Sequence, residues 1–372
     1  MSMKKMLAVL ATGAVALSLA ACASEGTSSG GGSGETIADC NVGISMPTRS
    51  LERWINDGEG LQQKLEDADC TVDLQYADNK TDQQISQIQN QIAGGAKILV
   101  IAAVDGEALA PVLDEAKKQD ATVIAYDRLI NGSENVDYYA TFDNYKVGTL
   151  QGEYIETTLD LANGAGPFNL EPFAGSPDDN NAKFFFSGAW DVLLPYIESG
   201  QLVVPSGKSP SSNDDWASIG IQGWASDKAQ AEMDNRLSSF YGGGTQVDVV
   251  LSPNDSLAIG IEASLKSAGY TPGEEYPVIT GQDADKANVQ AILAGEQSMT
   301  VWKDTRTLGD QVFEMLQSIT AGEEVEVNDT ETYDNGEKVV PSFLLTPEVV
   351  VKDDVQTKLI DSGFLKASDV GL

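Results

Sequence analysis

The chain has 372 residues and carries 57 acidic against 23 basic side chains, which gives a formal net charge of −34 at pH 7. This excess of negative charge opposes binding to nucleic acid or to an anionic membrane surface, and it favours a soluble, self-repelling monomer. The sequence contains no histidine, which excludes a Ser-His-Asp hydrolase site and a zinc site built on histidine.

The first residues indicate export. Two lysines precede an apolar stretch over residues 6–19, and a small-residue cleavage pattern leads directly into Cys22. This pattern resembles a bacterial lipoprotein signal, so we expect residues 1–21 to be removed and Cys22 to carry the lipid. The alternative is an ordinary secretory signal with an incidental cysteine. Residues 22–36 are rich in Gly and Ser and should form a flexible tether, which would hold the protein on the outer face of the bacterial cell membrane by its lipid alone.

Two further cysteines each stand just before a strand-like run. Cys40 precedes the apolar run Asn41–Met46, and Cys70 precedes the alternating run Val72–Ala77. If these two strands are parallel neighbours, the thiols lie at matching ends, and an exported protein can hold a disulfide. We therefore predict a Cys40–Cys70 disulfide, with two buried, reduced thiols as the alternative.

Strand-like and helix-like patterns alternate along the first part of the chain. Strands are expected at 41–46, 72–77, 98–102, 121–126 and 138–142, with helices at 51–66, 81–93 and 106–119. Thr81 and Gln84 have the spacing of a capping box at the start of the second helix. Strands that are apolar throughout are typical of a parallel sheet covered by helices on both faces.

The same alternation then restarts. Helices are expected at 145–159, 180–197, 226–239, 256–268 and 308–319, and strands at 167–173, 202–205, 247–251, 277–281 and 299–302, followed by a strand pair around 324–333 and 339–345. Two such series predict an α/β protein with two doubly wound parallel-sheet lobes and a cleft between them.

Polar and aromatic side chains gather just after the predicted strands, which is where open parallel sheets bind their ligands. These residues are Arg53, Trp54, Asp127, Arg128, Asp178, Asp179, Asn180, Asn181, Trp224, Asn254, Asp255, Asp283 and Lys303. Carboxylate, amide and guanidinium groups can each hold two adjacent hydroxyls, and an indole packs against the C–H face of a pyranose ring. The set therefore predicts a sugar site, although each member alone could be a helix cap, an ion pair or core packing.

Several segments carry a family resemblance, the most diagnostic being AYDR, GSPDDNNAK and GQDAD. They look like segments of the monosaccharide-binding proteins of ABC transporters, in the branch that includes D-xylose binders and multiple-sugar binders, and the match runs from about Cys40 to the C-terminus. The resemblance implies the type I periplasmic-binding-protein fold, whose two lobes are joined by a three-strand hinge. The expected N-terminal lobe comprises residues 37–142 and 304–341, and the C-terminal lobe residues 143–303 and 342–372.

The resemblance also implies the ligand contacts. Polar contacts are expected from Arg53, Asp127, Arg128, Asp179, Asn181, Asn254, Asp283 and Lys303, and stacking from Trp54 and Trp224. The alignment leaves two choices open, with Arg49 in place of Arg53 and Asp178 in place of Asp179. The expected function is capture of one aldose, such as xylose, glucose or galactose, and its delivery to an ABC transporter permease. No cofactor is expected, and no metal, because the acidic segment 328–336 lacks the spacing of an EF-hand loop.

Three other functions are alternatives to the delivery of a sugar to a permease. A glycosidase could use Asp179 and Asp283 as paired carboxylates, but the chain contains no reaction motif, and we expect no enzyme activity. A sugar-responsive transcription factor would need a basic helix-turn-helix module, where this chain has an export signal and a tether. A co-receptor that presents the sugar to a membrane sensor stays open, because the sequence does not distinguish a sensor from a permease.

Overall fold

The computed structural model describes residues 37, 40–273 and 276–372. The predicted signal peptide and the predicted tether, including Cys22, lie outside these residues. Among the described residues, no helix combines the length and the apolar character needed to span a membrane.

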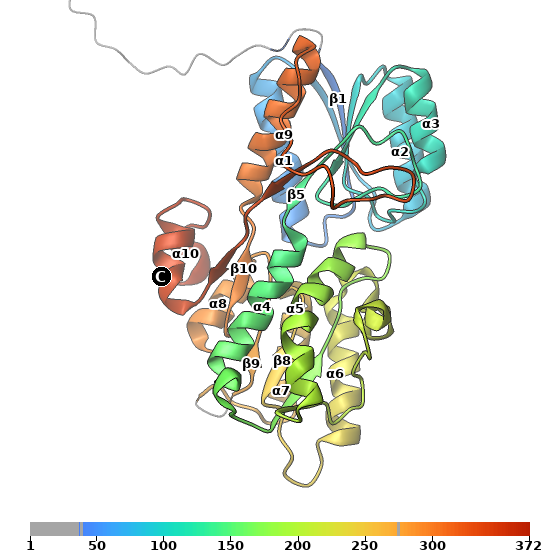
Figure 1. Cartoon of the computed structure of the whole chain (residues 1–372). Helices are drawn as coiled ribbons and strands as arrows, with labels where there is room; N and C mark the ends of the chain where they lie inside the picture. Colours follow the sequence, from blue (N-terminus) through green and yellow to red (C-terminus); the bar gives the residue numbers. More distant parts are fainter. Residues whose placement is uncertain (1–36, 38–39, 274–275) are drawn as a thin grey trace, which may run out of the picture. The chain divides into compact units, whose positions relative to one another are not determined.

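The first sheet has six parallel strands in the order β11-β5-β4-β3-β1-β2 (Figure 1). These strands are β1 (Asn41–Met46), β2 (Thr71–Tyr76), β3 (Ile98–Ile101), β4 (Thr122–Tyr126), β5 (Tyr138–Phe142) and β11 (Ser342–Leu345). Alternate residues of one strand enter different cores, so that Val100 lies in one apolar cluster and Leu99 in another. The prediction that helices cover both faces of this sheet is confirmed.

Four helices form the layers on the two faces of this sheet. They are α1 (Glu52–Asp67), α2 (Thr81–Ala93), α3 (Ala110–Lys118) and α9 (Thr305–Ala321). Leu61 of α1 and Leu308 of α9 share the core on one face, whereas Ile88 of α2 and Val112 of α3 share the core on the other. Figure 1 shows the same pairing, with α1 beside α9 and α2 beside α3.

The second sheet has four parallel strands in the order β7-β6-β8-β9. These are β6 (Phe168–Pro172), β7 (Leu202–Val203), β8 (Val249–Leu251) and β9 (Val278–Ile279), and the helices in this part are α4 (Asn144–Thr158), α5 (Asn180–Glu198), α6 (Ser226–Phe240), α7 (Asp255–Ser267) and α8 (Lys286–Ala294). A two-stranded antiparallel sheet joins β10 (Thr300–Trp302) to β12 (Glu348–Val350), and a short helix α10 (Ala367–Val370) stands near the C-terminus.

Close packing of α4 on α5 fixes the position of α5. A Cβ atom on Gly148 would lie 1.9 Å from the carbonyl oxygen of Phe185, and one on Gly188 would lie 2.0 Å from that of Tyr145. Because glycine has no side chain, the two helix backbones approach each other directly at these points. The N-terminus of α5, which carries several of the predicted site residues, is thereby held against α4.

Cys40 and Cys70 form the predicted disulfide, with Cα atoms 4.7 Å apart. Asn41 pairs with Thr71 in the parallel β1–β2 ladder, so each cysteine occupies the same position before its strand. The prediction of a disulfide between matching ends of two parallel strands is confirmed.

Two predictions about the C-terminal part are wrong. Residues 342–345 were assigned to the C-terminal lobe, but as β11 they pair with β5 in the first sheet; the hydropathy of a strand does not specify which sheet it joins. The predicted strand at 324–333 makes only one isolated bridge, Asp329–Ser342, and a second bridge, Asp334–Val339, lies just beyond its end. Side-chain bonds of Asp329 to the Thr332 backbone and hydroxyl hold this segment in a turn instead.

The predicted capping box of α2 is also wrong. The Thr81 and Gln84 spacing is present, but the Gln84 side chain is buried beneath the helix. Its Nε2 donates to the Ala102 carbonyl at 2.9 Å, and its Oε1 accepts from the Val104 backbone N–H at 2.7 Å. Gln84 therefore satisfies backbone groups at the end of β3, which leaves no side chain to close the cap.

One buried carboxyl group makes a pH-dependent contribution to stability. Glu262 on α7 is 1% exposed, and its Oε1 has no hydrogen-bond partner among the described residues. Burial raises its pKa from 4.5 to about 8, with Glu296 adding to the rise and Lys266 opposing it. The folded state therefore holds this proton more tightly than the unfolded state, and the stability linked to it is lost as the pH rises from about 4.5 through 8.

Replacing Glu262 with glutamine should therefore raise the melting temperature more at pH 9 than at pH 5. An amide has the same shape and carries no charge at either pH, and each kcal/mol gained corresponds to roughly 1–2 °C in a chain of this length, at about 2 cal/mol/K of unfolding entropy per residue. Thermal unfolding of both proteins at the two pH values measures the difference. Glu198→Gln, at the exposed end of α5, is the control and should shift neither melt. Equal shifts of Glu262→Gln at pH 5 and pH 9 would contradict the account.

Candidate functional site

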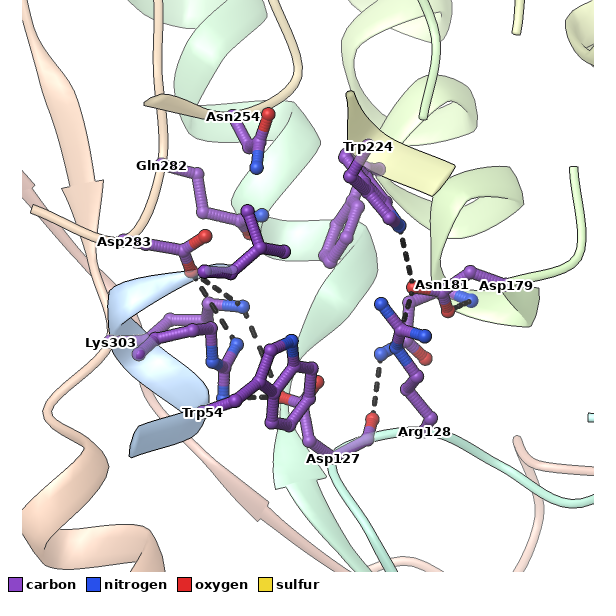
Figure 2. Close-up of a pocket in the computed structure, with 13 residues that line it drawn as sticks. Trp54, Asp127, Arg128, Asp179, Asn181, Trp224, Asn254, Gln282, Asp283 and Lys303 are labelled. Carbon is purple, nitrogen blue, oxygen red and sulfur yellow. Dashed lines mark hydrogen bonds and ion pairs between the residues drawn. The ribbon is translucent and has the colours of Figure 1, made fainter. Parts of the chain in front are cut away.

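Side chains from segments that are far apart in the sequence converge on one pocket (Figure 2). Its lining residues are Leu51, Arg53, Trp54, Asp127, Arg128, Asp179, Asn181, Phe185, Trp224, Asn254, Gln282, Asp283 and Lys303. All ten residues predicted as ligand contacts are among them. Leu51, Phe185 and Gln282 were not predicted.

The start of α1 sets which arginine enters the pocket. Arg53 lies in the first turn of the helix and is 6% exposed, whereas Arg49 lies before the helix and pairs with Glu59 on the surface. More than half of the Arg49 side chain is in solvent. Of the two alternatives that the alignment left open, Arg53 is the pocket residue.

Arg53 is the centre of an ionic network. Its Nη2 lies 2.9 Å from Asp57 Oδ2 and 3.1 Å from Asp127 Oδ1, and its Nη1 lies 3.5 Å from Asp283 Oδ1. Burial opposes the charge of Arg53, but Asp127, Asp57 and Asp283 together outweigh it and raise the arginine pKa well above its usual value. The guanidinium is permanently charged and holds segments that are far apart in the sequence.

Asp57 forms an ion pair with Arg53 and is not one of the residues that line the pocket. It accepts hydrogen bonds from Arg53 Nε at 3.1 Å and from the Tyr126 hydroxyl at 3.1 Å, and it is 2% exposed. Burial raises its pKa to about 6, although Arg53 opposes the rise. Asp57 is not among the predicted site residues; its position one turn after Arg53 on α1 was the available signal.

Lys303 is the second cation in the ionic network around Arg53. Its Nζ lies 3.1 Å from Asp283 Oδ1 and 3.9 Å from Asp127 Oδ1, and the lysine is 2% exposed. Burial acts to raise the pKa of Asp127, but Arg53 and Lys303 lower it below its usual value. Two cations and two carboxylates thus balance each other at this end of the pocket.

A second group of residues gathers at the N-terminus of α5. Asp179 caps this helix through the Asn181 backbone N–H at 3.0 Å, and it also lies 3.0 Å from Arg128 Nε and accepts from Trp224 Nε1 at 3.1 Å. Burial raises the pKa of Asp179, and Arg128 opposes that rise. Asp178 instead bonds outside the pocket lining, to Ser176 and Gln222, so Asp179 is the pocket residue of the two alternatives.

Two amide side chains add hydrogen-bonding groups to the pocket. Asn181 Nδ2 donates to the Asp127 carbonyl at 2.6 Å, and its Oδ1 accepts from the Tyr139 hydroxyl at 3.0 Å. Asn254 Oδ1 accepts from the Leu257 backbone N–H at 3.0 Å and caps α7. Asp179 and Asn254 are therefore both helix caps and pocket residues, so the two interpretations of them are compatible.

Aromatic rings form the remaining wall. Trp224 meets Phe185 edge to face, with ring centroids 6.2 Å apart. The guanidinium carbons of Arg53 and Arg128 lie 4.4 and 5.1 Å from the ring centre of Trp54, which is a favourable cation–π arrangement. The position of Trp224 depends on Gly175, where a Cβ atom would lie 2.1 Å from the indole.

Three of the nine non-glycine residues with a positive φ angle in the described part of the chain line the pocket. Asp127, Trp224 and Asp283 have φ angles of 58°, 54° and 101°, in the region that L-residues with side chains seldom adopt. Such conformations cost about 1–3 kcal/mol each, and they collect where ligands are held. A positive φ angle is unfavourable for an aromatic residue such as Trp224, and here it accompanies an indole that lines the pocket.

None of the pocket carboxylates is arranged as a free acid or base. Asp127 contacts Arg53, Asp179 contacts Arg128, and Asp283 contacts Lys303. A retaining or inverting glycosidase needs one carboxyl group that is protonated and faces the scissile bond. The arrangement holds hydroxyl groups well and offers no reacting pair.

Comparison with known proteins adds independent findings. A family model described as a periplasmic binding protein domain matches residues 42–324. The multiple sugar-binding periplasmic receptor ChvE of Rhizobium radiobacter is 50% identical over 330 residues, which cover 88% of this chain and 92% of that protein. The D-xylose-binding periplasmic protein of Escherichia coli is 35% identical, with coverage of 89% and 93%.

A solved structure of a sugar-bound protein is also similar to this chain in sequence and in fold. It is an ABC transporter solute-binding protein from Clostridium phytofermentans with bound β-D-glucose, and it is 49% identical to this chain. The alignment covers 88% of this chain and 99% of that one, with a TM-score of 0.84. The predicted two-lobed α/β fold is confirmed by this agreement.

Proposed function

The chain belongs to the periplasmic binding protein family, with the type I fold, and from this premise we propose that it captures a monosaccharide in the pocket around Arg53 and Asp283 and delivers it to an ABC transporter permease. The family is one of solute-binding proteins and not of enzymes. The observation that carries the proposal is the convergence of ten predicted contact residues on one pocket.

The charge balance of the pocket suits a neutral, polyhydroxylated ligand. Arg53, Arg128 and Lys303 supply three positive charges, and Asp127, Asp179 and Asp283 supply three negative ones. Each ion already has a partner, so a ligand gains from charge-assisted hydrogen bonds to its hydroxyls without needing a charge of its own. The rings of Trp224 and Trp54 offer apolar faces for the C–H patches of a sugar.

Binding would favour closure of the two lobes. Arg53, Trp54, Asp127 and Arg128 follow strands of the first sheet, whereas Asp179, Asn254 and Asp283 follow strands of the second. A sugar that bonds to both groups has a higher affinity for the closed form, and it shifts the population toward that form in proportion to this difference. A permease could then recognise the closed protein.

A thermal-shift screen tests the proposal. About ten monosaccharides, including D-xylose, D-glucose, D-galactose and L-arabinose, are added to the protein at millimolar concentration. A sugar present at 100 times its dissociation constant should stabilise the protein by roughly 2.7 kcal/mol. If no aldose raises the melting temperature, or if a sugar is chemically converted during incubation, the proposal fails.

A sugar-sensing co-receptor is the second candidate, because one relative carries the name of a receptor. Deletion of the gene separates the two functions. Loss of labelled-sugar uptake supports delivery to a permease, whereas normal uptake combined with loss of a sugar-induced transcriptional response supports the co-receptor.

We further propose that the mature protein is a lipoprotein anchored through Cys22. The support is the sequence Leu19-Ala20-Ala21-Cys22 and the Gly- and Ser-rich stretch after it. Labelling of cells with radioactive palmitate should mark the wild-type chain and leave Cys22→Ser unlabelled. Equal labelling of both chains would contradict the anchor.

A further inference from the structure

Three polar atoms of the pocket lining have no hydrogen bond within the described part of the chain. One of them, Arg128 Nε, forms an ion pair with Asp179 Oδ2 at 3.0 Å, and the other two have no partner of either kind among the described residues. They are Gln282 Oε1 and Trp54 Nε1; within the described part of the chain neither has a hydrogen bond, and both residues are 2% exposed. A buried polar atom without a partner destabilises the folded protein. Such atoms in a binding pocket indicate where a ligand supplies the missing partner.

A substitution of Gln282 is easier to interpret than a substitution of Trp54. Removing the Trp54 side chain would also remove a ring that contacts Arg53 and Arg128. The Gln282 side chain makes no hydrogen bond to another described residue, and Figure 2 shows it directed into the pocket. Its loss therefore changes the pocket and little else.

The backbone on both sides of Gln282 is firmly held. The Gly281 carbonyl accepts from Val301 N–H at 2.9 Å and from Gln151 Nε2 at 3.0 Å. The Gln282 carbonyl accepts from Asp255 N–H at 3.0 Å, and Asp283 N–H donates to the Val301 carbonyl at 2.9 Å. The side chain thus starts from a rigid position, which is the condition for reading one ligand group selectively.

We infer that Gln282 is a specificity-determining residue whose Oε1 accepts a hydrogen bond from one hydroxyl of the bound monosaccharide. This inference rests on the proposed function and adds one requirement to it. The ligand must present an O–H donor at the place where Oε1 points. A site built to bond a hydroxyl rejects an analogue without it, because the buried protein group is then left unpaired.

The test combines ligand analogues with the variant Gln282→Met, which keeps an unbranched side chain of similar size and removes the amide. Calorimetry measures the affinities of wild type and Gln282→Met for the best-binding aldose and for its deoxy and deoxyfluoro analogues at each position. Fluorine cannot donate a hydrogen bond. Gln89→Met, an exposed glutamine on α2, is the matched control.

At one ring position, both the deoxy and the deoxyfluoro analogue should bind wild type about tenfold to hundredfold more weakly than the parent sugar. Gln282→Met should lose most of this discrimination at that position and keep wild-type ratios at the others. Its melting temperature without sugar should equal or exceed that of wild type, because the substitution removes a buried unpaired group.

Three results would overturn the inference. They are equal discrimination by both proteins at every position, full affinity of wild type for the fluorinated analogue at the coupled position, and a melting temperature of sugar-free Gln282→Met well below that of wild type. Failure of wild type to bind any aldose would instead defeat the proposed function, so the two failures are distinguishable.

Discussion

Replacing Arg53 with methionine is expected to destabilise the sugar-free protein by about 3–5 kcal/mol at pH 7. The guanidinium neutralises Asp57, Asp127 and Asp283, and its removal leaves these carboxylates close together and largely out of water. Among the described residues, Asp57 would retain only the Tyr126 hydroxyl as a hydrogen-bond partner. Urea unfolding followed by circular dichroism measures the loss.

The chain supplies a matched control for this variant. Arg49→Met removes an arginine from the same stretch of chain, but its partner Glu59 is exposed and the pair lies on the surface. An exposed ion pair contributes about 0–1 kcal/mol, so Arg49→Met should leave stability almost unchanged. Similar losses in the two variants would contradict the buried network and the choice of Arg53 as the pocket residue.

Asp283→Asn is expected to weaken binding of the best sugar by about 2–5 kcal/mol, which corresponds to a loss of at least about thirtyfold in affinity. Asparagine keeps the shape and tolerates the positive φ of 101° at this position, where alanine would add backbone strain. What is lost is the charge that pairs with Lys303 and Arg53. These two cations would then face the ligand with Asp127 as their remaining pocket carboxylate.

Calorimetry on wild type and Asp283→Asn measures this effect, with Asp234→Asn on the exposed face of α6 as the control. The control should bind the sugar like wild type. If Asp283→Asn also retained the wild-type affinity, Asp283 would not belong to the ligand contacts. A variant that melts as wild type does but binds more weakly supports a direct role in binding.

β1, β3, β4 and β5 could be predicted because they are buried on both faces, whereas the edge strand β2 was predicted from its alternating pattern. Continuous apolar runs such as Ile98–Ile101 have no other common explanation when helical patterns flank them. The pocket residues could be predicted for a related reason, since polar residues directly after buried strands collect at one edge of a parallel sheet. Asp127 and Asp283 both illustrate this rule, since each follows a strand-like run and lines the pocket.

The features that escaped prediction depend on contacts between distant segments. Gln84 has the spacing of a cap, yet its side chain bonds to the backbone of Ala102 and Val104, just after β3. β11 pairs with β5 in the first sheet, and a short apolar run does not encode which sheet it joins. Asp57 follows no strand and contacts Arg53 from one turn further along α1. Gln282 directly follows the predicted strand at 277–281, so the strand-end rule that selected Asp283 applied to it as well.

Tryptophan fluorescence titration with D-glucose and D-xylose tests the central claim most directly, because Trp54 and Trp224 line the pocket. The account predicts a saturable change in emission with one site per chain, and recovery of the sugar unaltered by NMR after incubation. It also predicts that Asp283→Asn shifts the titration to higher sugar concentration. An emission spectrum that no aldose changes at millimolar concentration, or a sugar recovered as a new compound, would contradict the account.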